Sequence, residues 1–311
     1  MRRVMVAAMV ATVLVAAAGC LTPLTSQQPL TPVPLPASPL VGVYEPGVPG
    51  SWSKITEFTT ATGVKPGIAV YFSSWKQPFA VSFAQTAWGH GAYVLVQLEP
   101  KGVTLDSIVA GHSDAYLRSY ADAVAAFRHP VILSFGHEMN GTWYSWGDGQ
   151  ASPATFVAAW RHIVDVFRAE GAVNVTWLWT VSSIEGASSE LSKWWPGAGW
   201  VSWVGVAGYY YRASDTFGLV FGTTIADIRT FSSAPVLIAE TAVGTTANRE
   251  SQIDGLFAGV SEQGLPGVVW FDEAQHAGVY HQDWRLEDDP SALAAFTTAI
   301  STHLGAVNPH A

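Results

Sequence analysis

The sequence has little of what disulfide-stapled and nucleic-acid-binding proteins depend on. Its 311 residues include a single cysteine, Cys20, so no disulfide can form within the chain. Only 15 residues are Lys or Arg against 24 Asp or Glu, which gives a formal net charge of −9. This balance disfavours a nucleic-acid partner, because few basic side chains are present to neutralise a run of phosphates. It also predicts weak attraction of the folded body to an anionic membrane surface.

Sequence motifs of common cofactor and metal sites are missing as well. No G-x-G-x-x-G follows the first apolar run, so the phosphate-binding loop of dinucleotide-binding folds is absent from the sequence. No zinc motif occurs either, and the paired histidines that barrel metallohydrolases carry on their first strand are lacking. We therefore expect neither a cofactor nor a catalytic metal.

The N-terminus has the pattern of an exported protein. Two basic residues precede an apolar stretch over residues 4–18, which predicts a signal peptide over residues 1–19. The stretch is shorter than the ~20 residues of a membrane-spanning helix. Cys20 follows Ala-Ala-Gly as in a bacterial lipobox, so we expect lipid attachment at Cys20, with plain secretion as the alternative. The expected location is the outer face of the cell membrane, reached only through this N-terminal lipid, or the medium.

The segment over residues 20–39 predicts an extended linker. It contains six prolines and no charged residue, a composition that favours polyproline II over a packed core. A linker of this kind would hold a folded body away from the surface to which Cys20 attaches.

The remainder, residues 40–306, alternates apolar runs with helical patterns. The runs are continuously apolar, as parallel strands buried on both faces are. They span residues 40–44, 67–72, 92–98, 130–136, 175–179, 203–210, 235–240 and 267–271. Helices are expected between them, for example over residues 113–128, 152–171 and 291–304. Eight such units predict an α/β fold, a single (β/α)8 TIM barrel, and a doubly wound open sheet is the alternative.

Two glutamates at the ends of apolar runs carry the functional argument. Glu138 follows the fourth run and Glu240 ends the seventh, so in a barrel both would lie at the mouth on opposite sides. A carboxylate in such a place needs a partner or a function, because its desolvation is costly. Two opposed carboxylates in an aromatic cleft are what glycoside hydrolysis requires. The 14 tryptophans fit this chemistry, since their rings can stack on sugars; a structural ion pair is the alternative for either glutamate.

The stretch "HEMNGTWYSWG" over residues 137–147 resembles the acid/base motif of glycoside hydrolase family 26, a family of retaining (β/α)8 enzymes. The resemblance extends from "GVYEPG" near residue 42 to "DWRLEDDPSALAAF" at residues 283–296. It implies that Glu138 is the general acid/base and that Glu240, in "VLIAETA", is the nucleophile. Two departures are Ala207, where the family commonly has Asp, and Ala242, where it often has Gly.

Further site residues are expected around the two glutamates. The resemblance implies that His137 bonds near the nucleophile or substrate, and that Tyr209 donates to Glu240 and keeps it ionised. It also implies that Trp143 and Trp270 form sugar-stacking walls, with Trp270 beneath the reacting ring. From the residues alone, Asn140 is expected to supply fixed hydrogen bonds in the site and to bind substrate. Trp75, in a predicted loop, is a further candidate for a substrate subsite.

The expected function is that of a retaining endo-β-glycanase, a hydrolase whose partner is a polysaccharide or oligosaccharide substrate. The resemblance favours β-1,4-mannan as that substrate, with mixed-linkage β-1,3-1,4-glucan or β-1,3-xylan as alternatives. A non-catalytic carbohydrate-binding lipoprotein and an inactive barrel used as a scaffold are the rivals from other classes. A monomer is expected.

Overall fold

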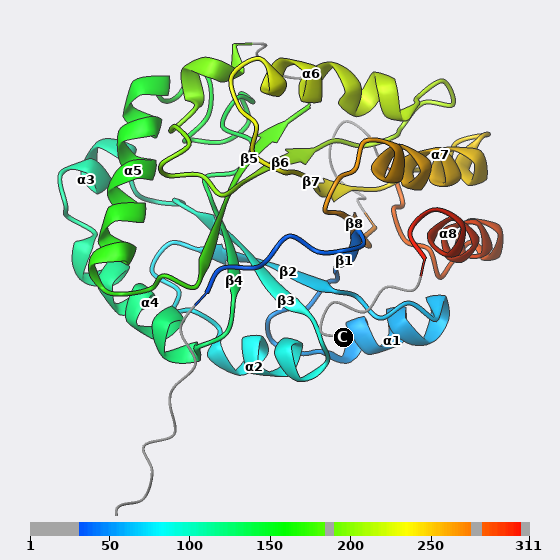
Figure 1. Cartoon of the computed structure of the whole chain (residues 1–311), viewed down its shortest axis with the longest axis horizontal. Helices are drawn as coiled ribbons and strands as arrows, with labels where there is room; N and C mark the ends of the chain where they lie inside the picture. Colours follow the sequence, from blue (N-terminus) through cyan, green and yellow to red (C-terminus); the bar gives the residue numbers. More distant parts are fainter. Residues whose placement is uncertain (1–30, 184–189, 275–281, 306–311) are drawn as a thin grey trace, which may run out of the picture.

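The computed structural model describes residues 31–183, 190–274 and 282–305. Eight parallel strands close into a barrel in sequence order, with β1 hydrogen-bonded to β8, and helices surround it (Figure 1). The predicted (β/α)8 barrel is therefore confirmed, and the doubly wound alternative is wrong. The expected signal peptide and Cys20, the expected site of lipid attachment, lie outside the described residues.

The strands coincide closely with the predicted apolar runs. They are β1 (Leu40–Tyr44), β2 (Ile68–Ser74), β3 (Tyr93–Glu99), β4 (Val131–Phe135), β5 (Val175–Ser182), β6 (Trp203–Ala207), β7 (Val236–Thr241) and β8 (Gly267–Phe271). Almost every strand residue is buried, because the barrel interior covers one face and the helices cover the other. The largest differences are at β5, which continues three residues beyond its predicted end, to Ser182, and at β6, which ends three residues before its predicted end, at Ala207.

The helices form the outer layer. They are α1 (Ser53–Thr62), α2 (Val81–Gly89), α3 (Leu105–Val109), α4 (Asp114–Phe127), α5 (Pro153–Ala169), α6 (Thr223–Arg229), α7 (Arg249–Glu262) and α8 (Pro290–His303), with short helical turns η2 (Leu191–Trp194) and η3 (Gly218–Gly222). The side chain of Ser152 caps α5 by accepting the N–H of Thr155, and proline occupies the first turn, as the sequence predicted. None of the helices in the described part of the chain has the length and apolar character needed to cross a membrane.

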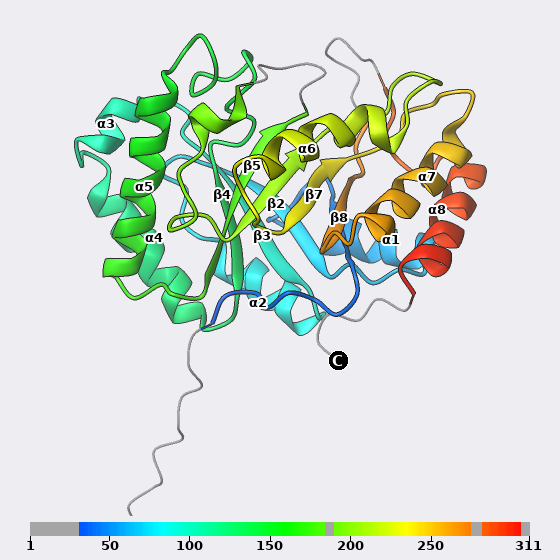
Figure 2. The same ribbon diagram turned by 45° about the horizontal axis from the view of Figure 1, so that its top comes forward.

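The bottom of the barrel is covered by residues of the expected linker. The segment before β1 runs across the amino-terminal ends of the strands (Figure 2). Within it Val33 is 6% exposed and packs against interior residues such as Leu40 and Ile68. Its N–H donates to the hydroxyl of Thr176 on β5, at 2.8 Å. Val33 is thus packed as part of the folded body.

Alternation along each strand separates the interior from the helix layer. On β8, for example, Val269 packs with the interior residues and Trp270 with the residues beneath the helices. The alternation is interrupted between β6 and β7, where Val206 pairs with Ile238 but Ala207 pairs with Glu240. This bulge inserts one extra residue into β7 and changes the direction of the side chains that follow it.

Candidate active site

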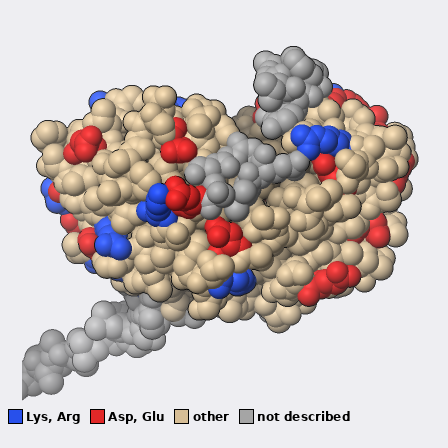
Figure 3. Space-filling view, turned by 90° about the horizontal axis from the view of Figure 1, so that it is seen from above, with Lys and Arg blue, Asp and Glu red and all other residues tan. Residues whose placement is uncertain are grey.

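The candidate site lies at the carboxyl ends of the strands, where β4, β6 and β7 present polar side chains. This is the end of a (β/α)8 barrel at which catalytic groups are found. Seen from above (Figure 3), charged side chains are scattered over the molecule rather than gathered into a patch of one sign. The site is therefore defined by a few named groups and not by a broad charged surface.

Glu138 is held in a sparsely populated backbone conformation. Its φ angle is +55°, in the left-handed region that residues other than glycine rarely adopt. The N–H of Glu138 donates to the carbonyl of Thr180 on β5 at 2.8 Å, and the N–H of Gly136 donates to the carbonyl of Leu98 on β3 at 3.0 Å. These bonds anchor the turn to both neighbouring strands. They offset a strain of about 1–3 kcal/mol, which is typical of functional sites.

The carboxyl group of Glu138 has two hydrogen-bonding neighbours. The indole N–H of Trp143 donates to Oε2 of Glu138 at 3.0 Å, and the hydroxyl of Ser182 also bonds to this carboxyl group. Gly141 makes the first contact possible, because a Cβ there would lie 2.3 Å from the Trp143 ring. Trp143 is 48% exposed, so its ring has one edge on the carboxyl group of Glu138 and another surface available to a ligand.

Glu240 reaches the mouth because of the bulge in β7. Ile238 packs outward beneath the helices and Ala239 packs inward, so strict alternation would direct Glu240 outward. Instead Oε1 of Glu240 accepts a hydrogen bond of 2.6 Å from the phenol of Tyr209, which follows β6. The structure thus has the Tyr209–Glu240 contact that the family resemblance implied.

Both carboxyl groups hold their protons more tightly than exposed glutamates do. Burial raises the pKa of Glu138, opposed by the hydrogen bonds from Trp143 and Ser182. Burial also raises the pKa of Glu240, and the negative charge of Glu138 adds to this rise while the Tyr209 hydroxyl opposes it. The two groups are therefore electrostatically coupled, and near neutral pH at least one of them is protonated.

His137 lies inside the loop that carries Glu138. It is 1% exposed, its Nε2 is 3.1 Å from the hydroxyl of Tyr144, and its carbonyl accepts the indole N–H of Trp146. Tyr144 in turn stacks on Trp146, with ring centroids 4.3 Å apart. Burial lowers the pKa of His137 to about 3, so the ring is neutral and orients Tyr144 beside the two glutamates.

Asn140 has a different place from the one expected. Its Oδ1 accepts the N–H of Ser182 at 2.8 Å, and its Nδ2 donates to the carbonyl of Ser182 at 2.9 Å. The side chain is fully buried. Since both ends of the amide are occupied by backbone, Asn140 does not reach a substrate; it fixes Ser182, whose hydroxyl bonds to Glu138. Ser182 was missed because the predicted fifth strand ended before it.

The structure does not bring Trp270 or Trp75 into the cleft. Trp270 is 1% exposed and packs edge-on against Phe296 of α8, on the helix side of β8. Trp75 packs against Tyr116 of α4 and Phe135, and its indole N–H donates to Ser113. Both were expected to contact sugar. Strand alternation directs Trp270 to the layer between the barrel and its helices, and Trp75, in the turn after β2, packs in the same layer.

Other aromatic rings take these places at the mouth. From β8 it is Phe271 that faces inward, stacked on Tyr44 with centroids 4.7 Å apart and edge-on to Tyr209. From β2, Phe72 meets both Tyr44 and His137. Tyr44 ends the first strand, and that position was the only sequence signal for this cluster. The resulting wall lies next to Glu240, whose charge adds to the rise that burial and Glu273 cause in the pKa of Tyr44.

The chemistry available to this arrangement is proton transfer and nucleophilic attack by carboxyl groups. Glu138 and Glu240 come from strands on opposite sides of the mouth and interact electrostatically. Within the described ranges, no group of three or more His, Cys, Asp or Glu side chains has the arrangement of a metal site. A pair of carboxyl groups flanked by aromatic rings is the arrangement used to hydrolyse glycosidic bonds.

Comparisons with known proteins agree with this assignment. Endoglucanase H of Acetivibrio thermocellus is 30% identical over 295 residues, which cover 86% of this chain and 32% of that protein. β-1,3-Xylanase TXYA of a Vibrio species is 27% identical over 113 residues, or 36% of this chain and 23% of that protein. The chain thus spans about a third or less of the length of these relatives.

A solved structure and a family model extend the comparison. The catalytic domain of the endo-β-1,4-mannanase from Bacillus sp. JAMB-750 superposes with a TM-score of 0.66 at 16% identity, covering 85% of this chain and 86% of that one, and so shares the fold. The model of glycosyl hydrolase family 26 matches residues 85–258, more than half of the sequence. The chain therefore belongs to glycosyl hydrolase family 26.

Proposed function

We propose that the protein is a retaining endo-β-glycanase in which Glu138 is the general acid/base and Glu240 the nucleophile. The observation that carries this proposal is the interacting pair itself, two partly buried carboxyl groups at the ends of β4 and β7. The hydrogen-bond lengths support the division of roles. The 2.6 Å bond from Tyr209 has the length expected for an ionised acceptor, whereas the 3.0 Å bond from Trp143 to Glu138 is of ordinary length.

The reaction takes two steps. In the first, the Glu240 carboxylate attacks the anomeric carbon while Glu138 transfers its proton to the departing glycosidic oxygen, which leaves a glycosyl ester on Glu240. In the second, the Glu138 carboxylate takes a proton from water, the water oxygen displaces Glu240, and the sugar leaves with its original anomeric configuration. Double displacement of this kind requires the two carboxyl groups to be about 5–5.5 Å apart.

For the substrate, we rank β-1,4-containing glucans, including mixed-linkage β-1,3-1,4-glucan, before β-1,4-mannan. The relative with 30% identity over most of this chain is named an endoglucanase. The mannanase structure is only 16% identical, so the likeness supports the fold more than the substrate. β-1,4-Mannan, which the family resemblance favoured in the sequence, is the second candidate. β-1,3-Xylan is the third, supported by the shorter match to a β-1,3-xylanase.

The test is a substrate panel with two inactive controls. Lichenan, carboxymethyl cellulose, galactomannan and β-1,3-xylan are incubated with the protein, with Glu138→Ala and with Glu240→Ala. Cleavage of one polymer that both substitutions abolish would establish the activity and its substrate. NMR measures the anomeric configuration of the released products, and an inverted configuration would overturn the retaining mechanism. Oligosaccharide binding without any cleavage would instead favour a carbohydrate-binding role.

We further propose that the protein is exported and anchored through Cys20. The supporting features are the leader over residues 1–19, the Pro-rich composition that follows it, and the position of Val33 at the barrel end opposite the site. An anchor on that side would leave the cleft facing away from the membrane. Metabolic labelling with a fatty acid tests this, since Cys20→Ala should remove the label and release the protein into the medium. Label that persists in Cys20→Ala would contradict the proposal.

A further inference from the structure

Two buried carboxyl groups that the proposed reaction does not use meet behind the wall of the cleft. Glu45 follows β1 and Asp272 follows β8, and these residues are 4% and 2% exposed. Tyr44 pairs with Phe271 in the β1–β8 ladder and the N–H of Asp272 donates to the carbonyl of Tyr44, so the next residues, Glu45 and Asp272, lie side by side at the ends of two neighbouring strands. The charge of Asp272 adds to the rise that burial causes in the pKa of Glu45. A hydrogen bond between two carboxyl groups requires a proton on one of them, because two carboxylates in contact repel each other. The pair therefore holds a shared proton whenever this contact is intact.

Asp272 connects three parts of the fold. Its Oδ1 accepts the indole N–H of Trp270 at 3.1 Å and the N–H of Leu286 at 3.0 Å. Its own N–H donates to the carbonyl of Tyr44 at 3.0 Å. The residue thus ties the end of β8 to the end of β1 and to the segment before α8. Any movement of the Glu45–Asp272 contact would be transmitted to these three places.

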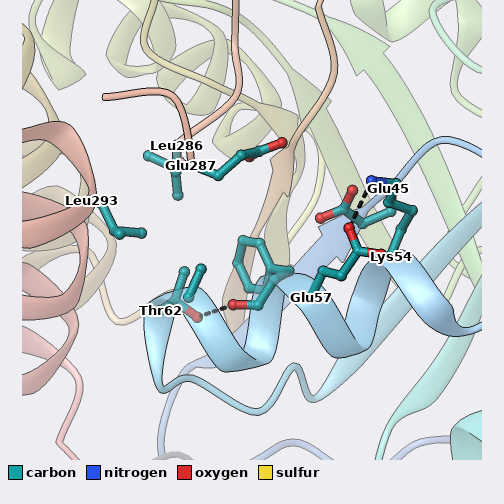
Figure 4. A pocket seen from close by; sticks show the side chains of 9 residues that line it. Glu45, Lys54, Glu57, Thr62, Leu286, Glu287 and Leu293 are labelled. Carbon is teal, nitrogen blue, oxygen red and sulfur yellow. Dashed lines mark hydrogen bonds and ion pairs between the residues drawn. The ribbon is translucent and has the colours of Figure 1, made fainter. Parts of the chain in front are cut away.

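The groups around the pair do not neutralise it. Glu45 and Glu287 line one hollow with Lys54 and Glu57 of α1 (Figure 4), and Lys54 is already paired with Glu57 at 2.6 Å. The negative charge of Glu287 adds to the rise that burial causes in the pKa of Asp272. Burial, then the charges of Asp272 and Glu287, raise the pKa of Glu45 to about 10, and Lys54 opposes this rise. Burial and the charge of Glu287 raise the pKa of Asp272 to about 7.

The same two chain segments carry the aromatic wall of the cleft. Tyr44 precedes Glu45 and Phe271 precedes Asp272, and their rings are stacked with an interplanar angle of 12°. Tyr44 is also hydrogen-bonded to Glu273, and Glu240 contributes to its raised pKa, which places it near the nucleophile. The carboxyl pair behind and the ring pair in front therefore join the same two strand ends.

We propose that Glu45 and Asp272 form a proton-held clamp that positions the Tyr44–Phe271 stack beside Glu240, and that loss of the shared proton loosens this side of the cleft. The positioning role rests on the proposed function, whereas the clamp does not. Its pH dependence has a definite sign. The carboxyl groups bind protons more tightly in the folded protein than in the unfolded chain, where a glutamate has a pKa of about 4.3. The free energy of unfolding must then fall as the pH rises from the pKa that these carboxyl groups have in the unfolded chain to the pKa that they have in the folded protein.

The test compares the wild type with Glu45→Gln and Asp272→Asn. An amide in either position donates to the remaining carboxylate at every pH, so the contact survives without a titrating proton. Thermal unfolding and hydrogen exchange of peptides covering residues 40–46 and 268–274 are measured from pH 5 to 10, with exchange corrected for its intrinsic rate. Relative to the wild type, we expect Tm of both variants to rise progressively above pH 6. Exchange at the two strand ends should accelerate at high pH only in the wild type.

A matched control keeps the result specific. Glu262→Gln removes the same charge from an exposed position on α7 and should leave both pH dependences unchanged. The clamp is overturned if the wild type and Glu45→Gln lose Tm in parallel, or if exchange at residues 40–46 is the same in both.

The positioning role is tested separately by oligosaccharide affinity in a Glu138→Gln background, where affinity should weaken above pH 8 unless Glu45→Gln is present. Equal weakening in the Glu138→Gln protein with and without Glu45→Gln would overturn the positioning role and would not contradict the clamp. An absence of oligosaccharide binding at any pH would count against the proposed function and the positioning role, and not against the clamp.

Discussion

The phenol oxygen of Tyr209 lies 2.6 Å from Oε1 of Glu240, and burial holds the pKa of this tyrosine well above its usual range. Tyr209 therefore remains a hydrogen-bond donor throughout the pH range in which the protein is folded. A donor at this distance favours the ionised form of the carboxyl group, and Glu240 needs that form to act as a nucleophile. The bond thus opposes the burial that would otherwise keep Glu240 protonated.

Replacing Tyr209 by phenylalanine should shift the acid limb of the pH–rate profile upward. Without the donor the pKa of Glu240 rises further, so a larger fraction of the enzyme is protonated and inactive at a given pH. Loss of a hydrogen bond to a charged group costs about 1.5–3 kcal/mol, so kcat/KM should fall about ten- to hundredfold below the optimum. Profiles of kcat/KM from pH 5 to 9 on the cleaved polymer measure both effects.

The control for this variant is Tyr116→Phe. Tyr116 donates to the carbonyl of Gln77 and packs on Trp75, away from the two glutamates. Its substitution should leave the pH–rate profile in place. An unchanged acid limb in Tyr209→Phe would show that the phenol does not stabilise the ionised nucleophile.

Substituting Asn140 by alanine should cost stability before it affects substrate binding. Both backbone groups of Ser182 that Asn140 satisfies are buried, and each would be left without its partner at a cost of about 1–3 kcal/mol. We expect the free energy of unfolding to fall by roughly 3 kcal/mol. Denaturant unfolding measures this, with Asn248→Ala as control, since Asn248 makes one exposed bond to Ala213. A normal stability with a raised KM would instead place Asn140 in contact with substrate.

The sequence was sufficient to predict the eight strands and the two glutamates at their ends. Parallel strands buried on both faces are continuously apolar, so their positions stand out, and the first polar residue after each run marks its carboxyl end. The same continuity hides which way each side chain points. In "VVWF" over residues 268–271, no polar residue shows whether Trp270 or Phe271 faces inward.

Two further features needed the structure for physical reasons. The inward direction of Glu240 depends on the bulge between β6 and β7, which is a property of the register between strands and not of either strand alone. The contact between Asn140 and Ser182 joins residues 42 apart in the sequence, and an asparagine close to the proposed acid/base Glu138 is equally compatible with substrate binding. Local patterns specify elements well, but they do not specify contacts between elements.

Substitutions can show which of the two neighbouring rings, Trp270 or Phe271, faces the cleft. Trp270→Phe removes the indole N–H that donates to Asp272 and to the carbonyl of Trp284, so it should lower stability by about 1–3 kcal/mol with little change in KM. Phe271→Ala removes a ring from the wall beside Glu240, and should lower kcat/KM about tenfold if that ring contributes about 1.4 kcal/mol to sugar stacking. Kinetics and thermal unfolding of both variants give the comparison. The reverse pattern, with KM raised only in Trp270→Phe, would restore Trp270 as the stacking residue.

The packing of Val33 predicts that the last part of the Pro-rich segment contributes to the stability of the barrel. Val33→Ala removes two buried carbon atoms from the bottom of the barrel, so the free energy of unfolding should fall by about 1.5–2.5 kcal/mol. Leu35 lies two residues further on and is 64% exposed, so Leu35→Ala should change the free energy of unfolding by less than about 0.5 kcal/mol. Both are measured by denaturant unfolding of the same length of chain. Equal, small effects of the two substitutions would mean that the segment does not pack on the barrel, and that the folded body begins at β1.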